Sequence, residues 1–145
     1  MISLPVASWI LYALLSAIFA ALVAIFGKVG LSGIDSTLAT TVRSIIMAAF
    51  LTVVSLALRK APLLSSLNSK LLTFIALSGI AGALSWLFYF FALKHGPASG
   101  VAALDRLSVV FVLVFAVLFL SEQLTWKTGL GALLVTIGAI LMSWR

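Results

Sequence analysis

Two adjacent charges stand inside an apolar stretch of the chain. Asp105 and Arg106 belong to residues 101–120, VAALDRLSVVFVLVFAVLFL, and every residue after Ser108 in this stretch is apolar. A helix of about 20 residues spans the hydrocarbon core of a bilayer, where one charge costs about 2.5–3.5 kcal/mol on insertion scales. The pair therefore requires partners, water or a function, and it is the first candidate for chemistry.

Other polar and aromatic side chains are expected at the depth of Asp105. If residues 36–58 form a helix, Arg43 lies about 10 Å along it, at ~1.5 Å per residue. Asp105 lies about 9 Å along its own helix, and Trp86 and Tyr89 lie about 8–12 Å before theirs ends. From this matched depth, we expect these groups to share a cavity.

Within the membrane, Asp105 is expected to pair with Arg43 rather than with its neighbour Arg106. Adjacent helical residues point about 100° apart, so Asp105 shares a face with Ser108 while Arg106 faces elsewhere. The arginine fork binds a carboxylate bidentately and stays charged. The pair either locks two helices together or forms a substrate or proton site, and Arg106 has no obvious partner in the chain.

The candidate substrate pathway combines these groups with a polar face on the first helix. Trp86 and Tyr89 are either core aromatics or a stacking wall of the cavity. The full set is Tyr12, Ser16, Arg43, Trp86, Tyr89, Asp105, Arg106 and Ser108.

Composition places the chain among helical membrane proteins. Of its 145 residues, 64% are hydrophobic and 8% are charged, whereas roughly a quarter of a soluble domain is charged. The long, unbroken apolar runs predict an all-α polytopic fold with spanning helices at about residues 4–26, 36–58, 71–93, 100–120 and 126–144. The basic residues behind the net charge of +6 stand singly at helix ends, which is typical of loop anchors and not of nucleic-acid binding.

Local signals predict how these helices begin and end. Asp35 or Ser36, Ser99 and Thr125 are expected to cap the second, fourth and fifth helices. Lys94 is expected in the turn after the third helix. No helix interior contains proline, so no broken helix is expected. Small residues on the last helix predict a packing ridge, made of Thr128, Ala132, Thr136, Ala139 and Ser143.

Enzyme chemistry finds little support in the sequence. The chain has one histidine, no cysteine and only three carboxylates, Asp35, Asp105 and Glu122. No metal-ligand spacing, phosphate loop or nucleophile motif appears. We therefore expect no catalytic residues, no metal and no cofactor.

Orientation in the membrane is not fixed by charge. The side that holds the N-terminus carries four basic residues, Arg59, Lys60, Lys70 and Lys127, and the other side carries three, Lys28, Lys94 and Arg145. Adding Arg43 and Arg106 to the second side gives four against five. A balanced count is what dual insertion would show, unless charge placement is simply uninformative in this chain.

Nearly the whole chain carries a family resemblance, whose motifs stand in the second half. A W-x-x-Y-x-x-A-L pattern at residues 86–93 is followed in order by DRLSVV at 105–110, SEQLT at 121–125 and a glycine-rich last helix. This pattern resembles the EamA-type domain of the drug/metabolite transporter superfamily. Arg43 and a first helix ending near Lys28 fit the same pattern.

The resemblance implies a five-helix unit, half of an inverted-repeat transporter of ten helices. Half-size members are expected to pair as homodimers, with antiparallel insertion one arrangement. The four-helix multidrug relatives use a glutamate in their first helix, which this chain lacks, so that coupling mechanism does not carry over.

The function expected first is a carrier that moves a small organic metabolite or drug across the inner membrane, where the chain would be multi-pass. The alternatives are a non-transporting subunit of a hetero-oligomer and a flippase-like unit for lipid-linked cargo. The expected partners are the small-molecule substrate, the lipid bilayer and a second copy of the chain, and no nucleic acid.

Overall fold

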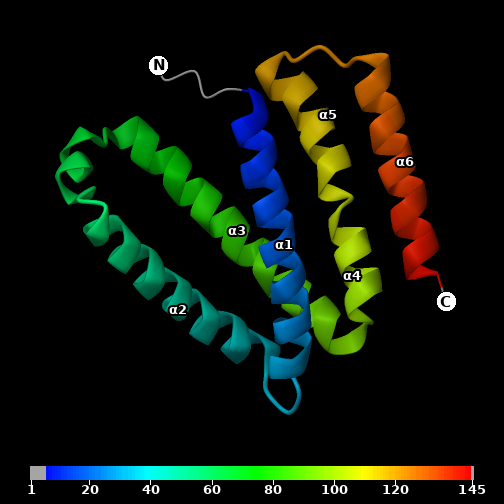
Figure 1. The fold of residues 1–145 in the computed structure, drawn as a ribbon, viewed down its shortest axis with the longest axis horizontal. Coiled ribbons are helices and arrows are strands. Elements are labelled where there is room, and N and C mark those ends of the chain that lie inside the picture. Colours follow the sequence, from blue (N-terminus) through cyan, green and yellow to red (C-terminus); the bar gives the residue numbers. More distant parts are fainter. Residues whose placement is uncertain (1–5, 145) are drawn as a thin grey trace. The chain divides into compact units, whose positions relative to one another are not determined.

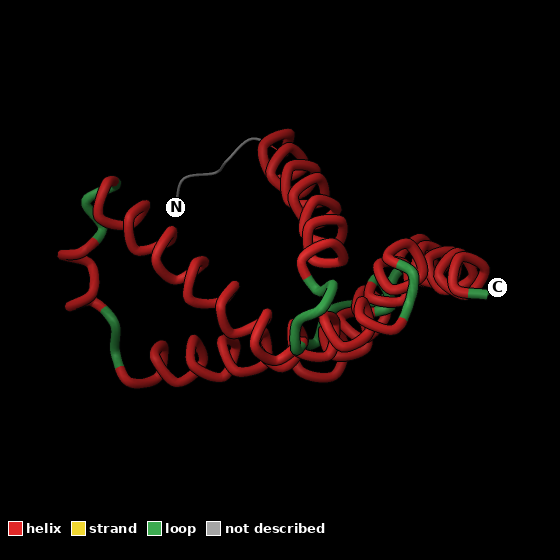
Figure 2. Tube along the Cα trace, turned by 90° about the horizontal axis from the view of Figure 1, so that it is seen from below, coloured by secondary structure: helices red, strands yellow, loops and turns green. Residues whose placement is uncertain are grey.

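The computed structural model describes residues 6–144 as helices joined by short loops, with no strand in that range (Figure 2). Five segments are long and apolar enough to cross a bilayer, which confirms the predicted all-α polytopic class. The elements are α1 (Val6–Gly30), α2 (Ser36–Ala57), the 3₁₀ helix η1 (Ala61–Ser66), α3 (Ser69–His95), α4 (Ala98–Asp105), α5 (Ser108–Leu120) and α6 (Trp126–Ser143) (Figure 1).

Two helices are longer than predicted. α1 continues through Lys28 to Gly30, and α3 includes Lys94, which was expected in a turn. The flexible stem of a lysine lets its ammonium group reach the membrane surface while its backbone stays helical. The predicted start of the first helix at residue 4 lies outside the described residues.

The helices fall into two compact units. Residues 30–94 form the hairpin unit, in which α2 and α3 run antiparallel and are joined through η1 (Figure 1). The terminal unit contains α4, α5 and α6 together with residues 6–29 of α1. Arg43, Trp86 and Tyr89 belong to the hairpin unit.

The hairpin unit begins with a turn and a cap that follow from the sequence. Gly33 adopts a φ of +83°, a left-handed conformation that glycine reaches without the steric cost of a Cβ atom. The Asp35 Oδ1 atom then accepts hydrogen bonds from the backbone N–H groups of Thr37 and Leu38, at 2.9 and 3.0 Å. The prediction of an N-cap at this position is confirmed, with Asp35 as the capping residue.

The terminal unit is organised around close contact between α4 and α6. A Cβ atom added at Gly100 would lie 3.3 Å from Pro97 Cγ and 3.6 Å from both the Met142 carbonyl oxygen and Ser143 Cα. Ala139 is also buried. The C-terminal end of the predicted ridge of small residues on the last helix therefore packs against α4 within one chain, because small residues let helix backbones approach closely.

The caps of the terminal unit agree with the sequence in one case and not in the other. Thr125 caps α6, and its Oγ1 atom accepts from the Thr128 N–H at 3.2 Å in a capping box. The expectation that Ser99 caps the fourth helix is wrong, because the helix begins one residue earlier, at Ala98, and Pro97 is the N-cap. Proline fixes φ near the value that leads into a helix, and no side chain caps the N–H groups at this end.

The fourth spanning segment is interrupted, contrary to the expectation that no helix is broken. α4 ends at Asp105 and α5 begins at Ser108, within a segment that otherwise runs from Ala98 to Leu120. Between them, Arg106 and Leu107 have ψ angles of −13° and −17°, closer to a 3₁₀ helix than to an α-helix. Absence of proline did not exclude a break here, because the N–H groups of Arg106 and Leu107 bond to carbonyl groups three residues back, and this tightening requires no special residue.

The α4–α6 contact predicts a specific sensitivity at Gly100. Gly100→Val would push branched methyl groups into Pro97 and the α6 backbone, and such overpacking typically costs about 1–3 kcal/mol. We expect a lower thermal unfolding temperature in detergent, measured by circular dichroism. Gly131→Val is the matched control, because a Cβ atom there meets nothing within 4 Å. Equal unfolding temperatures for the two variants would show that the α4–α6 contact tolerates a larger residue at position 100.

Candidate functional site

The central feature of the hairpin unit is Arg43 stacked on an aromatic ring. Arg43 Cζ lies 3.7 Å from the centroid of the Trp86 ring and 5.6 Å from that of Phe90. Arg43 comes from α2 and both aromatic residues from α3. The contact confirms that Arg43 and Trp86 lie at the same depth in their helices.

The aromatic residues form a continuous cluster on α3. The Trp86 and Tyr89 rings meet edge to face, with centroids 5.4 Å apart and planes at 74°. Phe90 lies 6.1 Å from Trp86 and is almost fully buried. Phe90 was not predicted as a site residue, although its spacing of four residues from Trp86 places it on the same helical face.

The Arg43 charge is only partly compensated inside the hairpin unit. A cation–π contact contributes about 0.5–2 kcal/mol, whereas an arginine at the centre of a spanning helix costs about 2.5–3.5 kcal/mol on insertion scales. Within residues 30–94, no hydrogen bond or ion pair reaches the guanidinium group. The one carboxylate of that segment, Asp35, is already engaged as the α2 cap. Arg43 therefore retains hydrogen-bonding capacity for a negatively charged group.

Backbone carbonyl groups bind the lysines at the ends of two helices. Lys94 Nζ donates to the Ile34 carbonyl oxygen at 3.2 Å, which ties the end of α3 to the turn before α2. In the terminal unit, Lys28 Nζ donates to the Gly96 carbonyl oxygen at 2.8 Å. These contacts position the helix ends, and sequence patterns gave no signal for either.

Polar groups are also buried at the start of α2. Ser36 is fully buried, and its Oγ atom has no hydrogen-bond partner in the described residues. Thr40 is also buried, and its Oγ1 atom donates to the Ser36 carbonyl oxygen at 2.8 Å. The first turn of α2 thus places a hydroxyl group inside the fold, one to two turns from Arg43 along the helix.

Asp35 is ionised more readily than an ordinary carboxyl group. Hydrogen bonds from the Leu38 and Thr37 N–H groups, with a contribution from the nearby Lys94 ammonium, hold the pKa of Asp35 below its usual value. At a pH between the lowered pKa of Asp35 in the folded chain and its ordinary pKa in the unfolded chain, the unfolded chain binds more protons than the folded one. The stabilisation is therefore complete above the ordinary pKa and is lost as the pH falls through the lowered pKa.

The interrupted span brings together Asp105, Arg106 and Ser108 in the terminal unit, and all three residues are exposed. The N–H of Arg106 donates to the Ala103 carbonyl oxygen at 3.1 Å. The N–H of Val109 donates to the Arg106 carbonyl oxygen, also at 3.1 Å. These bonds reach three residues back rather than four. The Ala102 and Asp105 carbonyl groups consequently lose their usual helical donors, so the break exposes backbone polarity beside charged side chains.

The two remaining pathway candidates lie on α1. Tyr12 and Ser16 are both exposed, and they are one helical turn apart. The structure thus brings Arg43 to Trp86, which in turn contacts Tyr89, in the hairpin unit. It gathers Asp105, Arg106 and Ser108 at the break. The predicted ion pair between Arg43 and Asp105 stays a prediction.

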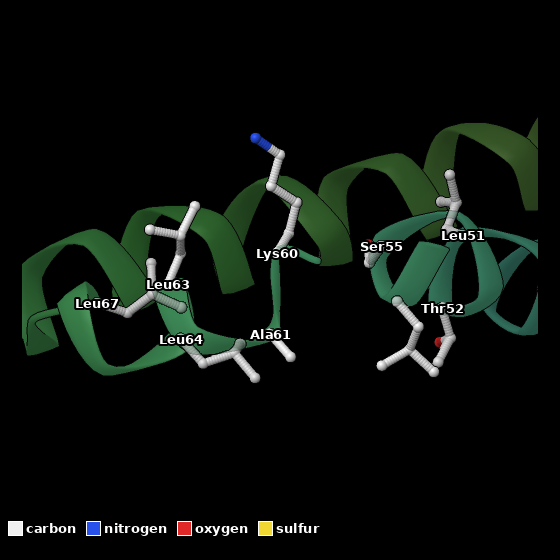
Figure 3. A pocket seen from close by; sticks show the side chains of 9 residues that line it. Leu51, Thr52, Ser55, Lys60, Ala61, Leu63, Leu64 and Leu67 are labelled. Atoms are coloured by element: carbon white, nitrogen blue, oxygen red, sulfur yellow. The ribbon is translucent and has the colours of Figure 1, made fainter. Parts of the chain in front are cut away.

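One hollow in the hairpin unit lies away from these candidates. It is a groove of about 490 Å³ between the end of α2 and η1. Figure 3 shows leucine side chains of η1 along it, with the Lys60 ammonium group pointing away from them. A smaller hollow of about 430 Å³ lies at the start of α6. Neither is lined by a predicted pathway residue.

Comparison with known proteins identifies the family. Residues 7–144 match the model of the EamA-like transporter family. The chain belongs to this family. The match covers all five spanning segments and is consistent with a multi-pass membrane transporter of half size.

Individual relatives of this EamA-like protein agree with that assignment. The chain is 43% identical to an uncharacterized transporter, encoded in the cobO 3′ region of Sinorhizobium sp., over 94% of this chain and 96% of the relative. It is 34% identical to the pseudopaline exporter of Pseudomonas aeruginosa over 44% of this chain and 22% of the exporter. No solved structure gives a significant match.

The lowered pKa of Asp35 predicts how the stability of this protein depends on pH. Asparagine is about as good an N-cap as aspartate, so Asp35→Asn should unfold near the wild-type temperature at neutral pH. Below the ordinary pKa of a carboxyl group, the wild type should lose stability on acidification more steeply than the variant. Thermal unfolding followed across this pH range measures both slopes.

Asp35→Ala is the control for capping itself, because it should lower the unfolding temperature at every pH while showing the same acid dependence as Asp35→Asn. The same acid slope in the wild type and in Asp35→Asn would show that the carboxyl proton of Asp35 is not linked to folding.

Proposed function

We propose that this EamA-like chain is a carrier that moves a small organic metabolite or drug across the inner membrane, and that it works as a homodimer. The observation that carries this proposal is Arg43, held within a spanning segment against Trp86. A subunit that only fills space in the membrane has no need for a charge there, since charged residues within spans usually mark substrate or ion pathways.

The interrupted fourth span supports the same function. Irregular backbone within a membrane is tolerated where it is buried in protein or lines a water-filled cavity. In many transporters, discontinuous helices of this kind supply main-chain polar groups to the transport site. The break between Asp105 and Ser108 has this character, with charged and hydroxyl side chains beside carbonyl groups released from the helical ladder.

A second copy of the chain is proposed because one copy buries little of the surface of its own spanning helices. In each spanning segment, at most 11% of the most apolar window is buried inside the chain. Lipid can cover apolar side chains, but it cannot solvate Asp105 or Arg106. An antiparallel partner would provide polar surfaces from both orientations, as an inverted repeat does within one longer chain.

Counterflow in proteoliposomes tests the transport function. Vesicles that contain the purified protein should exchange at least one member of a preloaded panel of small organic metabolites faster than empty vesicles. Lys60→Gln, in the loop beyond α2, is a control expected to exchange at the wild-type rate. Folded protein that exchanges no member of the panel would favour the alternative of a non-transporting subunit.

Cysteine labelling tests the antiparallel arrangement. The chain has no native cysteine, so Ser32→Cys and Ser65→Cys each provide one label site, at opposite ends of α2. If both orientations occur in the membrane, a membrane-impermeant maleimide should label each variant from both sides of the membrane. Labelling of the two variants from opposite single sides would exclude antiparallel insertion and leave a parallel dimer.

A further inference from the structure

We infer that Arg43, stacked on Trp86, is a recognition site for a carboxylate group of the transported substrate. This inference rests on the proposed carrier function and adds a substrate class to it. The site consists of a planar cation from α2 and an aromatic surface from α3, which lie 3.7 Å apart.

The stacked geometry leaves the hydrogen-bond donors of Arg43 available. A guanidinium group carries five N–H donors in its own plane, in a fork that matches a carboxylate. The contact with the Trp86 ring, with Cζ 3.7 Å from the ring centroid, is not a hydrogen bond and supplies the N–H donors with no acceptor oxygen. Within residues 30–94 no acceptor meets those edges, so the in-plane donors are oriented but unsatisfied.

The charge balance of the hairpin unit favours an external anion. Residues 30–94 contain five basic side chains and one acidic side chain, Asp35. That carboxylate accepts hydrogen bonds from two N–H groups at the start of α2, so it is held at the helix end. Arg43 therefore needs a negative charge from outside this unit.

A carboxylate matches the site better than a phosphate group. Arg43 supplies one permanent charge, and the other cation described near this end of α3, Lys94, already donates to the Ile34 carbonyl oxygen. A phosphate monoester carries close to two negative charges at neutral pH, so one arginine would leave part of that charge uncompensated. A single carboxylate carries one negative charge and can accept two parallel hydrogen bonds from one arginine.

Aromatic contact also keeps Arg43 ready to bind. Long arginine side chains lose rotamer freedom when they bind a ligand, and this ordering reduces affinity. Here the guanidinium group is already held on Trp86, and Trp86 is in turn supported by Tyr89 and the buried Phe90. The arrangement is therefore preorganised.

Tryptophan fluorescence provides a direct binding assay. Trp9, Trp126 and Trp144 are more than half exposed, so changing all three to phenylalanine leaves Trp86 as the single reporter beside Arg43. The purified protein in neutral detergent is titrated with the monocarboxylates butyrate, benzoate and cyclohexanecarboxylate, each compared with its neutral amide. Cyclohexyl phosphate and phosphatidylglycerol test phosphate and lipid headgroups.

At least one carboxylate should change the Trp86 emission saturably, with an affinity at least about tenfold higher than that of its amide. Arg43→Gln should remove this difference. Arg59→Gln, which removes an arginine of the same unit outside the span, should retain it. Equal affinities for acids and amides, or a stronger response to the phosphate compounds, would overturn the assignment.

Two further variants keep the test decisive. Arg43→Lys preserves the charge inside the span, so it should fold, but it loses the planar fork, and carboxylate affinity should fall severalfold. In Arg43→Gln combined with Asp105→Asn, binding should remain absent. Recovery of carboxylate binding or transport in this double variant would show that Arg43 only neutralises Asp105, and would overturn the inference.

The outcomes separate this inference from the carrier function. Carboxylate binding without counterflow of any metabolite would contradict the carrier and leave the binding site in place. Counterflow of neutral or cationic substrates that is unchanged in Arg43→Gln would support the carrier and overturn the binding site.

Discussion

The structure of the hairpin unit depends on how one permanent charge is accommodated inside an apolar segment. Arg43 cannot lose its proton, so the surrounding protein must replace the water that would otherwise solvate it. The Trp86 ring does so in part, and the contact requires α2 and α3 to meet at one particular level. The hydrogen bond from Lys94 to the Ile34 carbonyl oxygen joins the C-terminal end of α3 to the turn before α2. Together these interactions set the register of the hairpin.

Much of this arrangement was predictable because helices convert sequence spacing into depth. Counting residues from the helix ends placed Arg43 and Trp86 at one level, and their contact confirms the count. Asp35 and Thr125 were predicted as caps from residue type and position alone, and both make the expected hydrogen bonds. Composition was sufficient for the fold class, since so few charges cannot cover a soluble protein.

The sequence did not predict contacts that depend on backbone groups or on apolar side chains. Phe90 gives no polar signal, so its place beside Arg43 emerged only with the structure. The carbonyl partners of Lys28 and Lys94 lie about 60 or more residues away in the chain, and no residue pattern marks a carbonyl as an acceptor. The interruption after Asp105 was missed because no proline or glycine causes it.

The proline-free interruption also fixes an angle between the two halves of the fourth span. A residue in a 3₁₀ helix turns about 120° and rises about 2.0 Å, compared with about 100° and 1.5 Å in an α-helix. If Arg106 or Leu107 follows 3₁₀ geometry, that residue rotates α4 about the axis of α5 by about 20° more than it would in a continuous α-helix. α6 packs against α4 at Gly100. The added rotation therefore determines which face of α5 is turned toward α6. The backbone winding at Arg106 and Leu107 thereby sets the rotation of α5 relative to α4 and α6 in the terminal unit.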